Sequence, residues 1–462
     1  MSISPWSLLL TLLATFVRAE EAAAAVAEEA TPKAHISFSK EVAPIFVNKC
    51  QTCHNAEKAK GGFRVDTFEL LMKAGESKEA AIVPRDPTRS KIYQLITTTD
   101  PDDRMPQKDD PLPPTQIALI KDWIQQGAEF DRETRSEPLS AYVVSAAKVT
   151  TPAVYGYAPP ILALAFDAAG QELAASGYGE VTFWDPMRGK LVRRIGGSPA
   201  RIQALAYNRD GSMLAVCGGT PGLAGELAVL SCAANFQKRV LATASDLVLD
   251  GKFSPDGTRL ASAGSDNSIR IYQMPFGRQE LVIQQHADWV TAIAFSHDGK
   301  RLASASRDRS CRIFDVATGE LEATYLGHEG PALSVMFTPD DKLVCSAGRD
   351  RKIHIWDVKE AKKTHEISDA EGEILQLAAN AKRLFSCSTD KIVRAYDFRW
   401  EKKGVFAGHK DWVYALALDP AHNRLATGAF DGQVRLWDVE SGELIKAFSA
   451  VPGLENVRKG ED

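Results

Sequence analysis

The spacing of apolar residues divides the chain into two parts that meet near residue 158. In the first part, apolar side chains recur at helical spacing: Val42, Ile45 and Phe46 share one face of a predicted helix, and the segment 115–124 carries apolar residues three or four positions apart. Beyond residue 158, short runs of alternating apolar and polar residues are separated by turn-forming residues, which is typical of strands. The pattern predicts a small all-α domain followed by an all-β domain.

The strand-like part repeats with a nearly constant period. An aromatic residue followed by Asp recurs at Phe314-Asp315, Trp356-Asp357, Tyr396-Asp397 and Trp437-Asp438, at intervals of 42, 40 and 41 residues. Trp184-Asp185 marks an earlier unit, and Leu230-Ser231 fills the same slot in a divergent second one. Asp266 marks a further unit, because it stands 42 residues before Asp308 in a second series that continues through Asp350, Asp390 and Asp431, and the count over residues 158–449 is therefore seven. A repeat at this period strongly resembles the WD-repeat β-propeller, so the resemblance implies seven four-stranded blades stacked around a channel.

The resemblance also implies a hydrogen-bond network inside each complete blade. The matching side chains are His328, Ser346, Asp350 and Trp356 in one repeat, and His409, Thr427, Asp431 and Trp437 in another. We expect these residues to be structural, and we expect the second and sixth blades, which lack the His and the Trp, to be softer. His286, His328 and His409 hold the same position in different blades, so they are too far apart to share one metal ion.

Two segments compete to close the predicted ring. Residues 443–448 read as the closing strand of the last repeat, whereas residues 142–144 read as an extra strand ahead of the first blade. The sequence leaves both routes open. Residues 131–157, which include several prolines, are predicted to be a linker, and residues 450–462 a C-terminal tail.

The N-terminal residues 1–19 have the pattern of a signal peptide. Their apolar run, residues 8–17, is much shorter than the roughly 20 residues that a membrane-spanning helix needs. Val17-Arg18-Ala19 places small side chains where a signal peptidase reads them, although Met1–Ser7 contains no Lys or Arg. No Cys follows the run, which argues against a lipid anchor. We expect cleavage after Ala19, a flexible acidic tether over residues 20–35, a periplasmic or otherwise extracytoplasmic location, and no permanent membrane span.

Cys50-Gln51-Thr52-Cys53-His54 is a C-x-x-C-H motif, and its spacing suits covalent haem attachment. Two thiols three residues apart can each add to a vinyl group of one porphyrin, and the following imidazole can ligate the iron. A structural zinc site would need a second ligand pair, but the next cysteine is Cys217. A thioredoxin-like site would need a βαβ unit, which this segment lacks. The five remaining cysteines are expected to be buried single thiols.

The sixth iron ligand has three candidates. Met105 lies in a polar, proline-containing loop with no core to fill, which is easier to explain if its thioether reaches iron. Met72 lies in a helical pattern where a Met is usually core filler. His35 is the other histidine of this region. We favour His54 and Met105 as the axial pair, because His/Met ligation raises the reduction potential and suits electron transfer.

Residues 36–130 resemble the c-type cytochrome domain common in planctomycete bacteria. The matching blocks are CQTCH, GGFRVDT, AIVPRDPTRSKIY, the RMP loop and the IALIKDWIQQGAEF segment, in that order. Gln107 stands where a second Pro is usual, which leaves the methionine in place but loosens the loop. The resemblance implies a small all-α cytochrome c-like fold, one covalent haem c and electron transfer.

Composition and charge narrow the choice of partner. The net charge is -5, so no polyanion-binding surface is indicated and nucleic acid is a poor candidate. We expect an electron carrier whose propeller docks onto a protein redox partner or an envelope complex, with no catalytic residue of its own. Two alternatives stay open: a haem-based redox or ligand sensor with the propeller as output, and an enzyme like the cytochrome cd1 nitrite reductases, whose propeller has eight blades.

Overall fold

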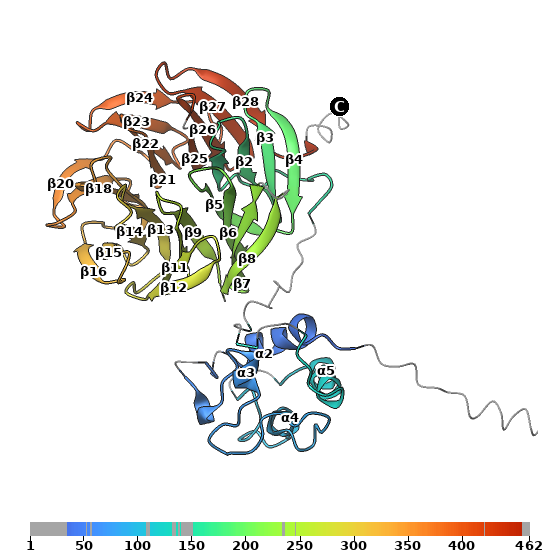
Figure 1. Ribbon diagram of the computed structural model, residues 1–462. Coiled ribbons are helices and arrows are strands. Elements are labelled where there is room, and N and C mark those ends of the chain that lie inside the picture. Colours follow the sequence, from blue (N-terminus) through green and yellow to red (C-terminus); the bar gives the residue numbers. More distant parts are fainter. Residues whose placement is uncertain are drawn as a thin grey trace, which may run out of the picture. The chain divides into compact units, whose positions relative to one another are not determined.

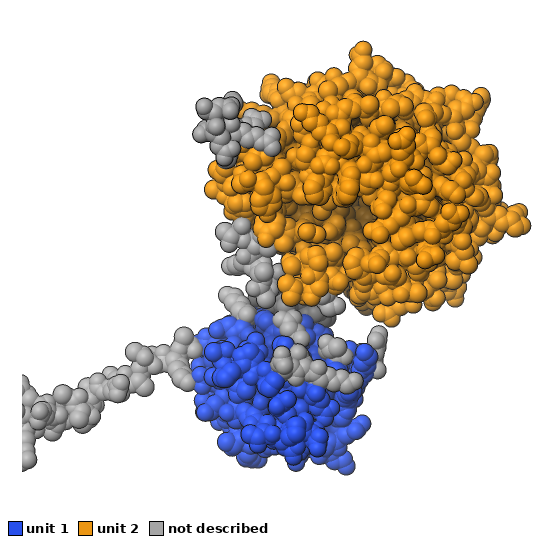
Figure 2. All heavy atoms as spheres, turned by 180° about the vertical axis from the view of Figure 1, so that it is seen from behind, with its two compact units in different colours: residues 1–142 blue, residues 143–462 orange. Residues whose placement is uncertain are grey.

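The computed structural model describes residues 35–51, 53–55, 58–107, 111–131, 135, 136, 139, 151–232, 236–244, 246–419 and 421–454. The chain divides into two compact units, residues 1–142 and 143–462, which are coloured separately in Figure 2. Each unit is described by itself. The predicted signal peptide, the tether up to residue 34 and the segment 142–144 lie outside the described residues. No helix among the described residues is long and apolar enough to cross a bilayer.

Unit 1 contains short helices joined by turns and irregular segments. They are the π-helix η1 (Phe38–Val42), α2 (Ala43–Lys49), the 3-10 helix η2 (Lys60–Gly62), α3 (Phe68–Leu71), α4 (Lys91–Thr97) and α5 (Pro114–Gln125). Helix α5 begins after Pro113, and Pro114 fits its first turn because a missing N–H costs nothing there. The described unit is therefore helical but less fully so than an all-α domain was expected to be.

One hydrophobic core holds unit 1 together. Phe38 lies at its centre, with its ring centroid 4.8 Å from that of Phe68 and 5.0 Å from that of Trp123. The Phe46 ring centroid of α2 lies 6.3 Å from that of Trp123 in α5, so these two helices pack together. The indole Nε1 of Trp123 donates to the carbonyl of Glu129 at 3.0 Å, which satisfies the one polar atom of this buried side chain.

Unit 2 is a seven-bladed β-propeller, and each blade is a four-stranded antiparallel sheet of consecutive strands (Figure 1). Blades 1 to 3 comprise β1 (Leu164–Phe166), β2 (Leu173–Ser176), β3 (Glu180–Asp185), β4 (Lys190–Gly196), β5 (Arg201–Tyr207), β6 (Met213–Thr220), β7 (Ala224–Ser231), β8 (Gln237–Ala244), β9 (Val248–Phe253), β10 (Arg259–Gly264), β11 (Ile269–Gln273) and β12 (Arg278–Ile283). Blades 4 and 5 comprise β13 (Val290–Phe295), β14 (Arg301–Ser306), β15 (Cys311–Asp315), β16 (Leu321–Tyr325), β17 (Ala332–Phe337), β18 (Leu343–Gly348), β19 (Ile353–Asp357) and β20 (Lys363–Ile367). Blades 6 and 7 comprise β21 (Ile374–Ala379), β22 (Arg383–Ser388), β23 (Val393–Asp397), β24 (Lys402–Phe406), β25 (Val413–Asp419), β26 (Arg424–Ala429), β27 (Gln433–Asp438) and β28 (Leu444–Ser449).

The first strands of the blades form the inner ring of the propeller. They contact one another in the cyclic order β1, β5, β9, β13, β17, β21, β25 and back to β1. The second strand of a blade is buried almost throughout, as in β18, whereas the fourth is mostly exposed, as in β20. This gradient explains the sequence pattern, because apolar residues are needed mainly on the inner strands and between blades.

The ring closes without exchange of a strand. All four strands of blade 7 come from the C-terminal end of the chain, and none of the seven sheets contains a described strand from before residue 164. The seam is formed by β1 against β25, with the Ile161 amide donating to the Ala429 carbonyl at 3.1 Å. On the outer side, Phe448 packs on Trp184 of blade 1 with ring centroids 5.4 Å apart. The closing strand over 443–448 is therefore the β28 of the structure.

Residues just after β28 continue the seam. The Ala450 amide donates to the Gly432 carbonyl at 2.9 Å. Val451 and Leu454 are buried in a small cluster with Tyr155, which lies ahead of the first blade. The Tyr155 hydroxyl donates to Glu180 at 2.7 Å, and Glu180 also pairs with Arg194 at 2.7 Å. The segments at the two ends of the propeller are thus tied together by apolar contacts and hydrogen bonds.

Candidate functional site

The C-x-x-C-H motif forms a tight turn at the end of α2. Cys50 is the C-cap of that helix, and its amide donates to the Phe46 carbonyl at 2.9 Å. The amides of Cys53 and His54 both donate to the Cys50 carbonyl, at 3.2 and 3.0 Å. The two cysteines and the histidine therefore follow one another within a single hydrogen-bonded turn, as the spacing predicted.

The two thiols of the turn have different surroundings. Cys50 packs against the hydrophobic core of unit 1. Burial, together with the charge of the nearby Cys53 thiolate, raises the pKa of the Cys50 thiol to about 12. In the unmodified chain Cys50 is therefore a protonated thiol at neutral pH, and it projects to the side of the turn where the apolar residues lie.

The His54 ring is oriented by a backbone contact. Its Nδ1 lies 3.3 Å from the carbonyl oxygen of Phe63, and because a carbonyl can only accept, Nδ1 carries the proton. Nε2 then has the lone pair that binds a metal, and a backbone carbonyl behind Nδ1 is a common way to fix a ligating histidine. The Phe63 ring packs edge-on against the imidazole, with centroids 5.4 Å apart. The sequence predicted His54 as a ligand but gave no sign of Phe63.

Both methionine candidates border the same core. Met105 and Met72 are partly buried and pack against the cluster that Cys50 also touches. The Met105 amide donates to the Leu95 carbonyl at 2.9 Å, which ties the loop to α4. Met72 is the C-cap of α3. The loop around Met105 is therefore not free of the core, contrary to the expectation from its polar sequence, and position alone favours neither methionine.

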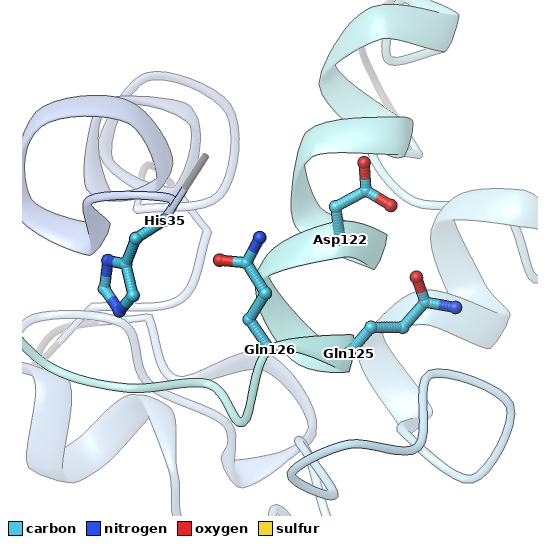
Figure 3. Close-up of a pocket in the computed structure, with 4 residues that line it drawn as sticks. All are labelled: His35, Asp122, Gln125 and Gln126. Carbon is cyan, nitrogen blue, oxygen red and sulfur yellow. The ribbon is translucent and has the colours of Figure 1, made fainter. Parts of the chain in front are cut away.

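His35 lies in a different environment. Its side chain is 64% exposed, with Nε2 3.4 Å from a Glu129 carboxylate oxygen. It borders a surface pocket whose other lining residues, Asp122, Gln125 and Gln126, come from the C-terminal end of α5 (Figure 3). The lining includes none of the other residues predicted to hold haem, which makes His35 the weakest of the three ligand candidates.

A partly buried arginine directly precedes Met105. The Nε of Arg104 is shielded from solvent and has no hydrogen-bond partner among the described residues. A shielded N–H group without a partner is costly, so an acceptor placed beside this nitrogen would be favourable. The sequence analysis did not single out Arg104, although its place directly before the candidate ligand was a signal.

Taken together, the groups around this core match the needs of a c-type haem. Two thiols lie on one turn, an imidazole presents its Nε2, a thioether borders the same apolar cluster, and the residue before that methionine has a shielded N–H group without a partner among the described residues. An apolar shell of this kind favours the reduced iron and so tunes its potential, and a thioether ligand raises the potential further. These thiol, imidazole and thioether side chains are therefore suited to hold a c-type haem.

The polar networks of the propeller are structural. In blade 5, His328 contacts Asp350 through Nδ1 at 2.7 Å and Ser346 through Nε2 at 2.8 Å, and the Trp356 indole donates to Ser346 at 3.1 Å. Blade 4 repeats the contacts of His286 with Asp308 and Ser304, at 2.9 and 2.6 Å. Each histidine is committed to its own blade, as expected.

Blades 6 and 7 depart from the expected network. In blade 7, His409 and Trp437 both contact Thr427, at 2.6 and 2.9 Å, but the His409 Nδ1 has no hydrogen-bond partner among the described residues, so the predicted contact with Asp431 is missing. Blade 6 replaces the missing histidine with an ion pair between Arg394 and Asp390 at 2.8 Å. Its polar interior is thus filled by different residues.

Blade 5 contains a further histidine that the sequence analysis missed. The His354 ring stacks on that of His328 with centroids 4.2 Å apart, and its Nδ1 lies 2.8 Å from the Tyr325 hydroxyl. His328, Asp350 and His354 bring their ligand atoms within 4.8 Å of one another. Both His328 nitrogens are already committed, however. Burial and the neighbouring His328 lower the pKa of His354 to about 4, so it is a neutral core side chain at pH 7.

Comparisons with known proteins match the two units separately. Residues 50–109 match the family described as planctomycete cytochrome C. Residues 223–273, 277–315, 319–357 and 400–438 match the WD domain, G-beta repeat. The chain joins a planctomycete-type cytochrome c segment to a WD-repeat propeller. The matched cytochrome segment contains Cys50, Cys53, His54, Met72 and Met105, and the WD matches cover part of a ring that the structure shows to have seven blades.

Curated relatives share only a short stretch with the cytochrome–propeller chain. Eukaryotic translation initiation factor 3 subunit I of Aspergillus niger is 37% identical over 76 residues, which is 16% of this chain and 23% of that protein. The same subunit of Coccidioides immitis is 36% identical over 80 residues, or 17% and 24%. The chain therefore spans about a quarter of the length of these relatives. A match of this length equals about two WD repeats.

Proposed function

We propose that the chain is an exported c-type cytochrome that transfers electrons and uses its propeller as a docking scaffold for a protein partner. The match to planctomycete cytochromes supports haem binding, and the WD-repeat propeller supports a role in protein interaction. The observation that carries the proposal is the turn of Cys50, Cys53 and His54, in which the Phe63 carbonyl holds Nδ1 of the imidazole and leaves Nε2 for iron.

In this proposal the residues near the turn would hold a haem. Cys50 and Cys53 would anchor the porphyrin through thioether bonds, and His54 and Met105 would ligate the iron. The haem c would supply a one-electron couple. The backbone hydrogen bond from the Met105 amide to the Leu95 carbonyl restrains the loop and so limits where the thioether can lie. Two protein ligands on the iron would leave no position for substrate, which is why we propose a carrier and no catalytic residue.

The signal-peptide pattern at the N-terminus supports the same proposal. Covalent haem attachment through a C-x-x-C-H motif takes place outside the cytoplasm, and residues 1–19 have the pattern of a cleaved signal peptide. We therefore propose a periplasmic location, with residues 20–35 as a tether. The enzyme alternative of the nitrite reductase type is disfavoured, because its propeller has eight blades and this one has seven.

The carrier proposal is tested by the visible spectrum of the purified protein. We expect reversible oxidation and reduction, and no change when carbon monoxide is added to the ferrous protein, because both axial positions are filled. Rapid binding of carbon monoxide would mean an open or labile position and would favour the sensor alternative. A protein that cannot be cycled between two redox states would contradict electron transfer.

A further inference from the structure

Three aromatic side chains form an exposed triangle on blade 7. Trp412 directly precedes β25, Tyr414 lies near the start of β25, and Phe430 directly follows β26. Their ring centroids are 6.4 Å (Trp412–Tyr414), 6.1 Å (Trp412–Phe430) and 6.1 Å (Tyr414–Phe430) apart. Trp412 is 46% and Phe430 45% exposed, although large aromatic side chains gain most when they are buried. We call these three residues the aromatic triangle.

Blade 4 provides an internal reference for this position. Trp289 precedes β13 as Trp412 precedes β25, and Arg307 follows β14 as Phe430 follows β26. The backbone contact is the same in both blades: the Arg307 amide donates to the Trp289 carbonyl at 3.0 Å, and the Phe430 amide to the Trp412 carbonyl at 2.9 Å. In blade 4 the Arg307 guanidinium lies over the indole, 4.3 Å from the ring centroid. The geometry thus accepts a cation on the indole face.

Blade 7 has aromatic surface where blade 4 has its own cation. Phe430 replaces the arginine and adds a second ring, and Tyr414 adds a third. A cation above the middle of the triangle would lie within the roughly 6 Å of each ring centroid over which a cation–π attraction acts. Three tilted rings offer such a cation more aromatic surface than the single indole of blade 4 does.

Carboxylates give the triangle a negative environment. Burial raises the pKa of the Tyr414 hydroxyl, and the charges of Asp411 and Glu373 raise it further. Glu373 is paired only loosely, with Arg349 at 3.5 Å, and both side chains of that pair are largely exposed. A surface ion pair of this kind contributes little and is readily exchanged. An incoming cation would therefore meet both aromatic faces and acidic oxygens.

We propose that the aromatic triangle binds a lysine or arginine side chain of a partner protein. The triangle lies at one end of β25, a strand of the inner ring, so the partner segment would lie at the mouth of the propeller channel. Aromatic residues in a cluster of this kind carry much of the binding energy in protein interfaces. The proposal extends the scaffold role of the propeller and does not depend on haem, so the two can fail separately.

The test is a titration of the full-length protein with acetyl-Gly-Gly-Lys-Gly-Gly-amide, followed by the NMR signals of the peptide. The control peptide has norleucine in place of lysine and so keeps the chain length without the charge. We expect saturable binding of the lysine peptide and at least tenfold weaker binding of the norleucine peptide. No binding of the lysine peptide, or equal binding of both peptides, would overturn the proposal.

Protein variants locate the binding. We expect Phe430→Ala to weaken binding of the lysine peptide at least tenfold. Phe430→Arg should abolish it, because it recreates the internal pair of blade 4 and places the chain's own cation on the indole. Blade 4 shows that this pair is compatible with the fold. Phe276→Ala, which removes an aromatic side chain that is 79% exposed elsewhere, should leave binding unchanged. Binding that survives Phe430→Arg, or that is lost in Phe276→Ala, would overturn the proposal.

Discussion

The seam of the propeller yields a prediction that two matched substitutions can test. In several blades an aromatic residue of the fourth strand packs on an aromatic residue in the third strand of the next blade. Phe406 of β24 lies 5.7 Å from Trp437, and Phe448 of β28 lies 5.4 Å from Trp184. The first pair joins blades 6 and 7 within the chain. The second joins blades 7 and 1 across the seam, where the described strands of each blade are consecutive in the chain.

The magnitude follows from burial. Phe406 is 1% and Phe448 9% exposed, so both truncations remove a nearly buried ring. Truncation of a buried phenylalanine to alanine costs about 3 to 5 kcal/mol. We therefore expect Phe406→Ala to cost about 4 kcal/mol and Phe448→Ala, which removes slightly less buried surface, about 3 kcal/mol. The two costs should be comparable because the interfaces are alike.

The assay is equilibrium unfolding in urea of the full-length variants, followed by tryptophan fluorescence. Val405→Ala, next to Phe406 but 49% exposed, is a suitable surface control and should change stability little. A cost for Phe448→Ala near that of the control, together with a full cost for Phe406→Ala, would refute the reasoning. It would mean that blades 7 and 1 are not packed together and that the ring is open at the seam.

The remaining predictions concern pH, the axial ligand and the reduction potential. His354 has a folded-state pKa of about 4, below the usual value of about 6.5, so the unfolded chain binds an extra proton between these pH values. The free energy of unfolding should therefore fall as the pH drops through that window. His354→Gln should reduce this fall in urea unfolding, and an unchanged pH profile would contradict the assignment. Met105→Ala should abolish the absorption band of an iron–thioether bond, and Met72→Ala should keep it. The reverse result would mean that Met72, and not Met105, ligates the iron. Arg104→Gln should lower the reduction potential, because it removes a positive charge next to Met105 that would favour the reduced iron, and Arg104→Lys should largely restore it. Equal potentials in a redox titration would mean that Arg104 lies too far from iron to matter.

The blade count was predictable because it depends on a periodic feature. Residues such as Asp315 and Asp357 mark the same point of successive repeats, so counting them counts the blades. Ring closure was not predictable in this way. It depends on contacts between residues far apart in the chain, such as Ile161 with Ala429, and no local pattern reports them. The same limit explains why the missing contact of His409 with Asp431 could not be foreseen.

The residues that would bind haem were predictable from the sequence, but the contacts that orient them were not. Cys50, Cys53 and His54 are adjacent in sequence, so their turn follows from spacing alone. Phe63 supports His54 through a backbone carbonyl, which every residue possesses and no motif can mark. The aromatic triangle was visible in principle, since Phe430 stands where blade 4 has Arg307. Its meaning required the three rings to be brought together by the fold.

The central claim is that haem is attached covalently to this chain through Cys50 and Cys53. The direct measurement is extraction of the denatured protein with acidified acetone, after production in cells that mature c-type cytochromes. The account predicts that pigment stays with the polypeptide, is lost in the Cys50→Ser, Cys53→Ser double variant, and is retained in Cys217→Ser, which removes a buried thiol of the propeller. Extraction of all pigment from the unaltered protein, or no pigment at all, would contradict it.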